Sequence, residues 1–152
     1  MLPYDLSEEE SVISRCISIK KNLVSRDDRD KGERQLLNFG HSFGHAIERL
    51  SNYCLSHGSA VAIGMAIMAN ASQRTKFCLQ EDAGRLIGMI RVLGLPTDCP
   101  YGADDIFEAM LLDKKRQHGD ITLVMMHAMG DCQLHSLPLS EAYEVLKLGL
   151  SL

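Results

Sequence analysis

Tryptophan is absent from this chain of 152 residues, and aromatic residues make up only 5% of it. No CxxC pair occurs either, and the number of cysteines is odd. The five lie far apart, at Cys16, Cys54, Cys78, Cys99 and Cys132. This spacing argues against a disulfide framework and against a cysteine zinc site, and it fits free thiols in a reducing cytoplasm. We therefore expect a cytoplasmic protein whose core relies on aliphatic residues and on eight methionines.

Long runs of one chemical character are also missing. No apolar run reaches the roughly 18 residues that a membrane span needs, and the nearest, Val61–Ala71, is typical of a buried helix. The acidic start, MLPYDLSEEESV, does not resemble a signal or transit peptide. The net charge is −4 without a long basic run, so a nucleic-acid partner is not expected. Neither GxGxxG nor GxxxxGK[ST] occurs, so these residues show no nucleotide-binding loop.

What is present predicts a mainly α fold in one domain spanning residues 1–152, with about six helices and a small β-hairpin near the C-terminus. Ser7 and Glu10 form a capping box that opens the first helix. Apolar spacing and caps predict helices at Glu8–Ser25, Arg34–Ser51, from His57 or Gly58, from Leu79, from Ala103, and at Leu139–Gly149. β-branched and alternating residues predict strands at Ile121–Met126 and Cys132–Ser136, joined by a turn at Met129–Asp131.

Two glycines, Gly40 and Gly44, fall inside the second predicted helix. A glycine within a helix costs about 0.5–1 kcal/mol relative to alanine. Their common face suggests close approach by another backbone or by a ligand. Plain tight helix packing is the competing interpretation, and the sequence leaves both open.

Three histidines form the most reactive group in the sequence. His41 and His45 share one helix face, and a short connection brings His57, at the start of the next helix, near them. Imidazoles from adjacent helices can bind Zn²⁺, although three histidines without a carboxylate are not diagnostic. HExxH is absent, and Glu48 lies nearly two turns from His41, which disfavours a metal-dependent hydrolase. The other three, His118, His127 and His135, are interpreted as surface or structural residues.

Four segments resemble the C-terminal domain of the 3-dehydroquinate synthase family, within the sugar phosphate cyclase superfamily. They are IKKNLVSRDDRDKGER, RQLLNFGHSFGHAIE, LSHGSAVAIGM and LLDKK. The resemblance runs over nearly the whole chain and is most specific in the second and third segments. It implies the helical, metal- and substrate-binding half of a cytoplasmic carbon–oxygen lyase of aromatic amino-acid biosynthesis.

In that family, the substrate is DAHP, a seven-carbon sugar acid phosphate. The resemblance implies oxidation of a hydroxyl by NAD⁺, elimination of phosphate, reduction of the ketone, and ring opening and closure to 3-dehydroquinate. It further implies a divalent metal, zinc or alternatively cobalt, and NAD held by a Rossmann-like N-terminal domain. The full-length enzymes of the family are commonly homodimers.

The resemblance also assigns roles to single residues. His41 and His57 match the two histidine metal ligands, whereas His45 matches a histidine that contacts substrate. Substrate-contacting positions of the family are further matched by Lys20, Arg34, Asn38, Lys114 and Lys115, with Lys20, Arg34, Asn38 and His45 counted as catalytic. These residue types suit the task, since arginine and lysine bind carboxylate and phosphate, and asparagine and histidine direct hydrogen bonds to hydroxyls.

Several features depart from the family pattern. The family's third metal ligand, a glutamate, and its NAD domain belong upstream of this segment, so we expect the 152-residue chain alone to be inactive. Ser59 stands where the family usually has a glutamate, Glu33 replaces a leucine, and Asp30 replaces a glutamate. Another sugar phosphate cyclase and a non-catalytic helical binding module remain the alternatives.

Overall fold

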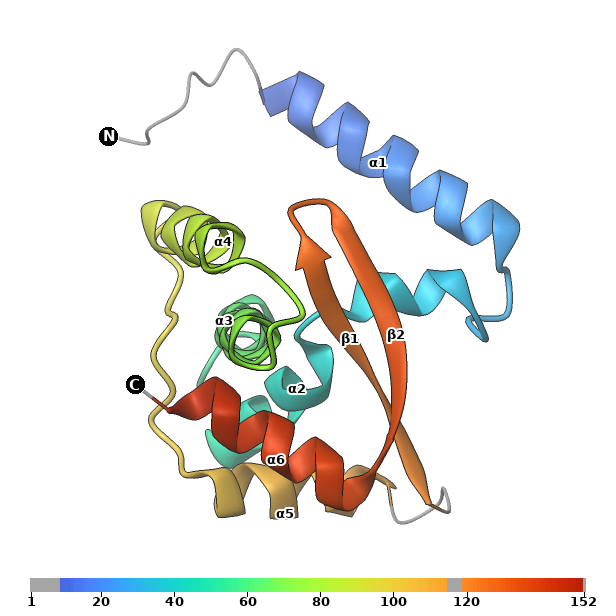
Figure 1. Cartoon of the computed structure of the whole chain (residues 1–152). Helices are drawn as coiled ribbons and strands as arrows, with labels where there is room; N and C mark the ends of the chain where they lie inside the picture. Colours follow the sequence, from blue (N-terminus) through green and yellow to red (C-terminus); the bar gives the residue numbers. More distant parts are fainter. Residues whose placement is uncertain (1–8, 115–118, 152) are drawn as a thin grey trace.

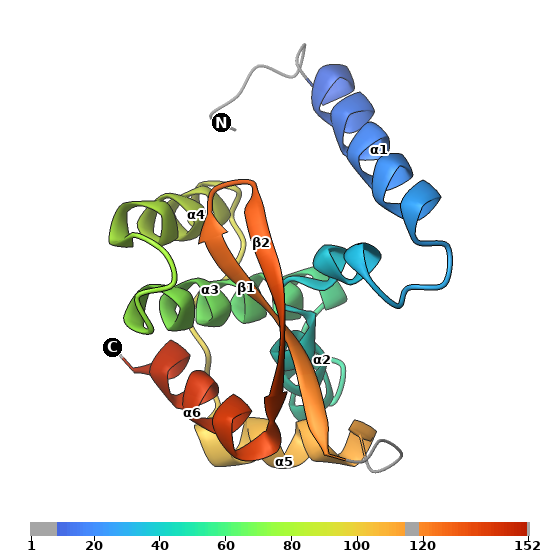
Figure 2. The ribbon, with the colours of Figure 1, turned by 45° about the vertical axis from the view of Figure 1, so that its right-hand side comes forward.

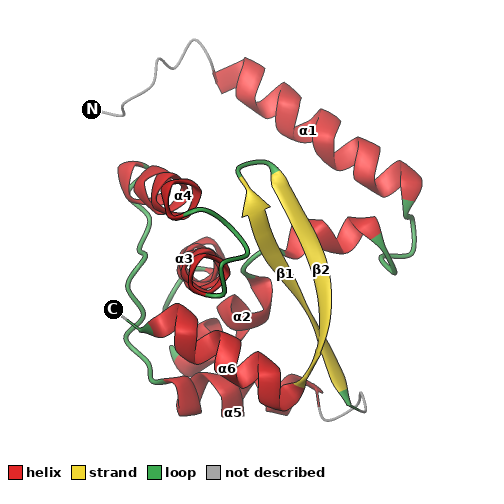
Figure 3. Ribbon diagram, viewed as in Figure 1, coloured by secondary structure: helices red, strands yellow, loops and turns green. Residues whose placement is uncertain are grey.

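The computed structural model describes residues 9–114 and 119–151. Figures 1 and 3 show a helical body against which one twisted β-hairpin packs. In chain order the elements are α1 (Glu9–Arg26), the 3-10 helix η2 (Glu33–Asn38), α2 (His41–Leu50), α3 (His57–Arg74), α4 (Gln80–Val92), α5 (Ala103–Lys114), β1 (Asp120–Ala128), β2 (Asp131–Pro138) and α6 (Leu139–Leu150). The predicted mainly helical fold with a hairpin near the C-terminus is confirmed.

Helix α3 is the centre of the packing, because α2, α4, α6 and β1 all contact it. Its sequence, HGSAVAIGMAIMANASQR, is rich in small and apolar residues and therefore allows close neighbours on several sides. Ten of its residues are buried. Ser56 caps its first turn by accepting a hydrogen bond from the backbone N–H of Ser59, at 3.2 Å. This cap fixes the start of α3, and with it the position of His57.

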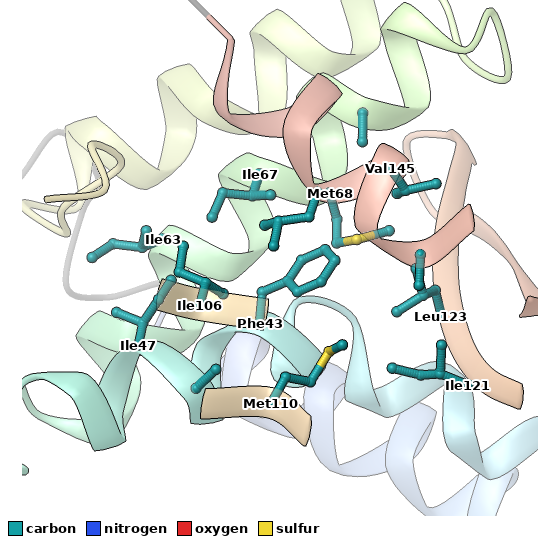
Figure 4. Packing of buried hydrophobic residues seen from close by; sticks show 14 of the residues in the cluster. Phe43, Ile47, Ile63, Ile67, Met68, Ile106, Met110, Ile121, Leu123 and Val145 are labelled. Atoms are coloured by element: carbon teal, nitrogen blue, oxygen red, sulfur yellow. The ribbon is translucent and has the colours of Figure 1, made fainter. Parts of the chain in front are cut away.

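The main hydrophobic core, shown in Figure 4, joins α2, α3, α5, β1 and α6, and a smaller cluster of Ala69, Cys78, Ala83 and Met126 joins α4 to α3 and β1. Phe43 of α2 lies near its middle and is completely buried. The other large, fully buried apolar side chains come from α2, α3, α5, β1 and α6, and they are Ile47, Ile63, Met68, Ile106, Ile121, Leu123 and Leu146. Since Phe43 lies between His41 and His45 in the sequence, the residues that fill the core also orient the histidine face of α2 outward.

The hairpin pairs β1 and β2 in antiparallel register, from Asp120 opposite Pro138 to Met126 opposite Cys132, with an irregularity between Met126 and Ala128. It is slightly longer at both ends than predicted. Strand β1 packs on the body and is tied to α3, because the Met126 backbone N–H donates to Ser72 Oγ at 3.1 Å. The Ser72 hydroxyl in turn donates to the Met68 carbonyl at 2.8 Å. This buried pair of hydrogen bonds fixes the hairpin against α3.

The predicted continuous helix at Arg34–Ser51 is wrong. The chain forms η2, breaks at Phe39 and Gly40, and resumes as α2. Gly40 has φ +79°, a left-handed conformation that glycine adopts without the steric cost of a side chain. A methyl group on Gly40 would come within 2.5 Å of the backbone nitrogen of Met65, and one on Gly44 within 3.0 Å of Val61 Cα. Close approach of another backbone, that of α3, therefore explains both glycines.

Helix α1 projects from the body, as Figure 2 shows, and its main contact with another element is with η2. The predicted helix is confirmed from Glu9 onward, whereas its Ser7 cap lies outside the described residues. None of its residues is buried, and Val12, Ile13 and Ile17 are each more than half exposed. Among the described residues, no helix is long and apolar enough to cross a membrane. All five cysteines are free thiols.

Candidate metal and anion site

His41, His45 and His57 meet at the contact between α2 and α3. Their ring centroids form a nearly equilateral triangle with sides of 5.4, 5.5 and 5.5 Å. One turn of α2 separates the first two, and the backbone contact at Gly40 and Gly44 brings the start of α3 against them. The predicted approach of His57 to the histidine pair is therefore confirmed.

Hydrogen bonds orient two of the three imidazoles. The Nδ1–H of His41 donates to the Phe39 carbonyl at 3.3 Å, and the Nδ1–H of His57 donates to the Glu48 carboxylate at 3.1 Å. A carbonyl and a carboxylate can only accept, so each bond places the proton on Nδ1 and leaves the lone pair on Nε2. Within the described residues, no such hydrogen bond orients His45, whose ring lies against the other two.

The electrostatics of His41 favour a neutral ring. Partial burial lowers the pKa of His41 below its usual value, and the charges that His45 and His57 carry when protonated lower it further. Its bond to the Phe39 carbonyl acts in the opposite direction, but burial is the larger effect. A neutral imidazole with a free lone pair is the form that binds a metal ion.

The geometry fits a divalent metal ion. One ring nitrogen from each histidine lies within 4.8 Å of those of the other two. In a tetrahedral site with Zn–N bonds of about 2.1 Å, ligand nitrogens lie roughly 3.4 Å apart, so modest side-chain rotation closes the difference. His45 and His57 are exposed and His41 is half-buried, which leaves them free to make that adjustment.

Two adjoining hollows lie beside the histidines. The larger, of about 350 Å³, runs between α2 and β1, and its lining includes His41, His45, Asn38 and Thr122. The smaller, of about 240 Å³, lies where α1 meets η2. Its lining includes Lys20, Arg34, Asn38 and His41. Asn38 and His41 line both, so the structure brings together five of the predicted site residues, with His57 at the edge of the cluster.

Arg34 is held by the loop between α1 and η2. Asp27 accepts backbone hydrogen bonds from Lys31 at 3.1 Å, Gly32 at 2.7 Å and Arg34 at 3.2 Å. These donors stabilise the carboxylate and lower the pKa of Asp27. The Arg34 side chain also donates to the Asp28 carbonyl at 3.1 Å. The loop thus positions a cation at the rim of the smaller hollow.

The remaining predicted residues lie elsewhere. The side chain of Lys114 and the whole of Lys115 and His118 fall outside the described residues. His127 is exposed and bonds Asp131 at 3.1 Å, and His135 packs edge-on against Phe77. Both agree with their interpretation as surface or structural residues. Ser59, whose hydroxyl accepts from Ser56 at 2.8 Å, belongs to the cap of α3.

Sequence reasoning missed Glu48. Its separation from His41 suggested too great a distance, yet residues seven and three apart on a helix share a face, and this spacing could have revealed it. Residues that reach the larger hollow from other segments, Gln35, Asp120 and Thr122, were also missed. No local sequence pattern indicates the contributions of the hairpin, because they depend on how β1 packs against α3 and η2.

A family model described as "3-dehydroquinate synthase C-terminal" matches residues 2–116, which is most of the chain. The chain belongs to this family. The 3-dehydroquinate synthase of Syntrophotalea carbinolica is 41% identical over 129 residues. That alignment covers 84% of this chain and 36% of the relative, so the chain spans little more than a third of the relative's length.

Solved structures of sugar phosphate cyclases share the fold of this C-terminal domain family. A 2-deoxy-scyllo-inosose synthase complexed with carbaglucose-6-phosphate, NAD⁺ and Co²⁺ superposes with a TM-score of 0.78 at 25% identity, covering 95% of this chain and 43% of that one. ValA, the 2-epi-5-epi-valiolone synthase of Streptomyces hygroscopicus with NAD⁺ and Zn²⁺ bound, gives 0.78 at 24% identity, covering 92% and 39%.

Proposed function

We propose that this chain is the metal- and substrate-binding half of a 3-dehydroquinate synthase, which converts DAHP to 3-dehydroquinate with loss of phosphate. The observation that carries the proposal is the convergence of three histidines with Lys20, Arg34 and Asn38 around two adjoining hollows. Family membership supports the reaction, and the residues supply the contacts that an anionic, polyhydroxylated substrate requires.

His41 and His57 are the proposed metal ligands, and His45 is left to contact substrate. The hydrogen bonds support this division, because, of the three histidines, His41 and His57 have Nδ1 engaged by an acceptor among the described residues. A divalent metal held there would polarise the hydroxyl group that is oxidised. Zinc and cobalt both suit nitrogen ligands, and the relatives in solved complexes hold one or the other.

Arg34 and Lys20 are proposed to bind the anionic groups of the substrate at the smaller hollow. A guanidinium offers paired donors to a carboxylate, and an ammonium offers a point charge to a carboxylate or a phosphate. Asn38 lies between the two hollows and can both donate to and accept from a sugar hydroxyl. Lys114 and Lys115 remain proposed substrate contacts on the strength of the family resemblance alone.

We further propose that the enzyme is a cytoplasmic homodimer. It would use NAD held by the N-terminal domain and an upstream glutamate as a further metal ligand. In this proposal the histidines and cations contact the substrate, and the NAD held by the N-terminal domain accepts the hydride. We therefore expect the isolated 152-residue polypeptide not to turn over DAHP. The proposed conversion of DAHP to 3-dehydroquinate is a step of the shikimate pathway.

A chimeric enzyme tests the proposal. The aligned segment of the Syntrophotalea carbinolica synthase is replaced by this chain, and phosphate release from DAHP is followed with NAD⁺ and Co²⁺ or Zn²⁺ present. We expect turnover by the chimera that is lost on His41→Ala. A folded, metal-loaded chimera that releases no phosphate from DAHP contradicts the proposal.

Another sugar phosphate cyclase is the second candidate, favoured by the structural similarity to enzymes that act in other cyclase reactions. The same chimera is offered DAHP, glucose 6-phosphate and sedoheptulose 7-phosphate. Arg34 favours the substrate that bears a carboxylate, which is DAHP. Preference for either carboxylate-free sugar phosphate would move the assignment to this second candidate.

A further inference from the structure

Glu48 lies on the same face of α2 as His41 and His45, about one turn after His45, and it contacts the histidine cluster through His57. Residues 41, 45 and 48 are spaced four and three apart, so they form one row along the helix. The Glu48 carboxylate reaches across to α3 and accepts the Nδ1–H of His57 at 3.1 Å. Its side chain is 20% exposed, whereas that of His57 is 55% exposed. The carboxylate is therefore the better-fixed partner of the two.

The backbone around Glu48 is anchored as well. Its carbonyl accepts from the Ser51 hydroxyl at 2.7 Å and from the Tyr53 backbone N–H at 3.0 Å. Asn52 and Tyr53, which lead toward α3, both adopt left-handed conformations with φ of 50° and 58°. This tight turn returns the chain so that His57 opens α3 directly beside Glu48. The end of α2 and the start of α3 are thus fixed relative to each other at this contact.

We propose that Glu48 is a positioning residue that holds His57 in the Nδ1–H tautomer and aims its Nε2 at the metal site. This inference rests on the metal-binding role proposed above. An exposed imidazole without a partner samples several rotamers and both tautomers, and metal binding must then select one. A carboxylate on Nδ1 makes that selection beforehand.

The two proposed metal ligands, His41 and His57, are oriented by different kinds of hydrogen-bond acceptor. His41 is oriented by the Phe39 carbonyl, which is part of the backbone that leads into α2. His57 lies in the first turn of α3, and within the described part of the chain its Nδ1 acceptor is a side chain, that of Glu48 on the neighbouring helix. Replacing the Glu48 side chain can therefore release His57 without disturbing the hydrogen bond of His41.

The first measurement is the tautomer of His57 in the metal-free chain, read from ring ¹⁵N and ¹³C chemical shifts. We expect the Nδ1–H form in the wild-type chain and in Glu48→Gln, whose amide oxygen still accepts. We expect a shift toward the Nε2–H form in Glu48→Ala. An Nε2–H wild-type ring, or a tautomer that Glu48→Ala leaves unchanged, overturns the role of Glu48.

The second measurement is the affinity for Co²⁺ alone, followed by its visible absorption. We expect Glu48→Ala to bind Co²⁺ about 10–100-fold more weakly than wild type, with Glu48→Gln in between. Asp131→Asn is the matched control, because Asp131 makes the same 3.1 Å contact with His127 far from the cluster. It should leave Co²⁺ affinity unchanged.

The outcomes separate the two proposals. Loss of Co²⁺ binding in His41→Ala but full affinity in Glu48→Ala would keep the metal site and overturn the positioning role. A chimeric enzyme that carries the upstream glutamate and still does not bind Co²⁺ would defeat the metal-binding role itself. If Glu48 only ties two helices together, Glu48→Ala lowers the unfolding temperature of the metal-free chain while the tautomer and the Co²⁺ affinity stay unchanged.

Discussion

Gly40 and Gly64 lie backbone against backbone where α2 begins and α3 passes, with no room for a methyl group on either. This contact sets the distance between the two helices that carry the histidines. It also explains why the chain breaks at Gly40, because a continuous helix would place other atoms in the space that α3 occupies. The site therefore depends on a glycine pair that contacts no ligand.

Gly64→Ala is expected to destabilise the fold, although alanine is the better helix former. The gain in helix propensity is about 1 kcal/mol, whereas overpacking of a tight interface typically costs about 1–3 kcal/mol and here meets rigid backbone. We expect a net loss of roughly 1–2 kcal/mol in the free energy of unfolding, measured by urea denaturation.

Gly88→Ala is the matched control for that change. Gly88 also lies inside a helix, but a methyl group there meets nothing within 4 Å. We expect it to stabilise the chain by about 0.5–1 kcal/mol. Equal effects of the two substitutions would show that packing against Gly40 does not limit position 64.

The division of labour among the histidines gives a second prediction. His41→Ala and His57→Ala should each abolish tight Co²⁺ or Zn²⁺ binding, because each removes a proposed ligand whose Nδ1 is already engaged and whose Nε2 keeps its lone pair. His45→Ala should leave the affinity largely unchanged and instead reduce turnover of DAHP in the chimeric enzyme. The measurements are metal titration of the purified chain and phosphate release by the chimera.

The result for His45 can contradict this division. One of its ring nitrogens lies within 4.8 Å of those of the other two histidines, so the geometry also permits a three-histidine ligand set. If His45→Ala weakens metal binding as strongly as His41→Ala does, the chain binds its metal with all three rings.

The sequence was informative where the signals are local. The helical spacing and the charges of α1, the turn at Gly130 and the start of α6 at Leu139 are all readable from neighbouring residues, and the structure confirms them. The histidine cluster was also predictable, since a four-residue spacing and a short connection leave few other arrangements.

What the sequence could not show depends on contacts between distant segments. From the sequence, Gly40 is predicted to lie inside a helix, and only its contact with Gly64 and Met65 explains the break there. The apolar spacing of α1 predicts the helix but not its surroundings: Ile17 is exposed, and α1 contacts the described chain mainly through η2. Glu48 was discounted by its distance from His41 alone, although its partner is His57 on the next helix.

Lys20 provides a third prediction, on substrate binding. It lines the smaller hollow with Arg34, whereas its neighbour Lys21 points to a different side of α1 and does not line it. A hydrogen bond to a charged group contributes about 1.5–3 kcal/mol, so Lys20→Ala should raise KM for DAHP in the chimeric enzyme by about 10–150-fold. Lys21→Ala should leave KM unchanged, and equal effects of both would indicate only a general loss of positive charge.

Asp27 gives a fourth prediction, which concerns pH. Its folded-state pKa is lowered because backbone N–H groups of Gly32, Lys31 and Arg34 stabilise the carboxylate. A lowered pKa means that the folded state holds the proton less tightly than the unfolded state does. The stabilisation by Asp27 is therefore fully present above its ordinary pKa of about 3.8 and is lost as pH falls through the lower folded value.

Asp27→Asn should reproduce this loss at neutral pH, because an amide accepts these hydrogen bonds without the negative charge. Hydrogen exchange at the backbone amides of residues 31, 32 and 34 should be faster in Asp27→Asn than in wild type at pH 7, with the difference closing in acid. Asp28→Asn is the control, since Asp28 accepts from Arg34 through its backbone carbonyl, which the substitution keeps. Unchanged protection in Asp27→Asn would mean that the loop is held by its backbone conformation rather than by the carboxylate. In the chimeric enzyme the same substitution should raise KM for DAHP, because Arg34 would lose the support that places its guanidinium at the hollow.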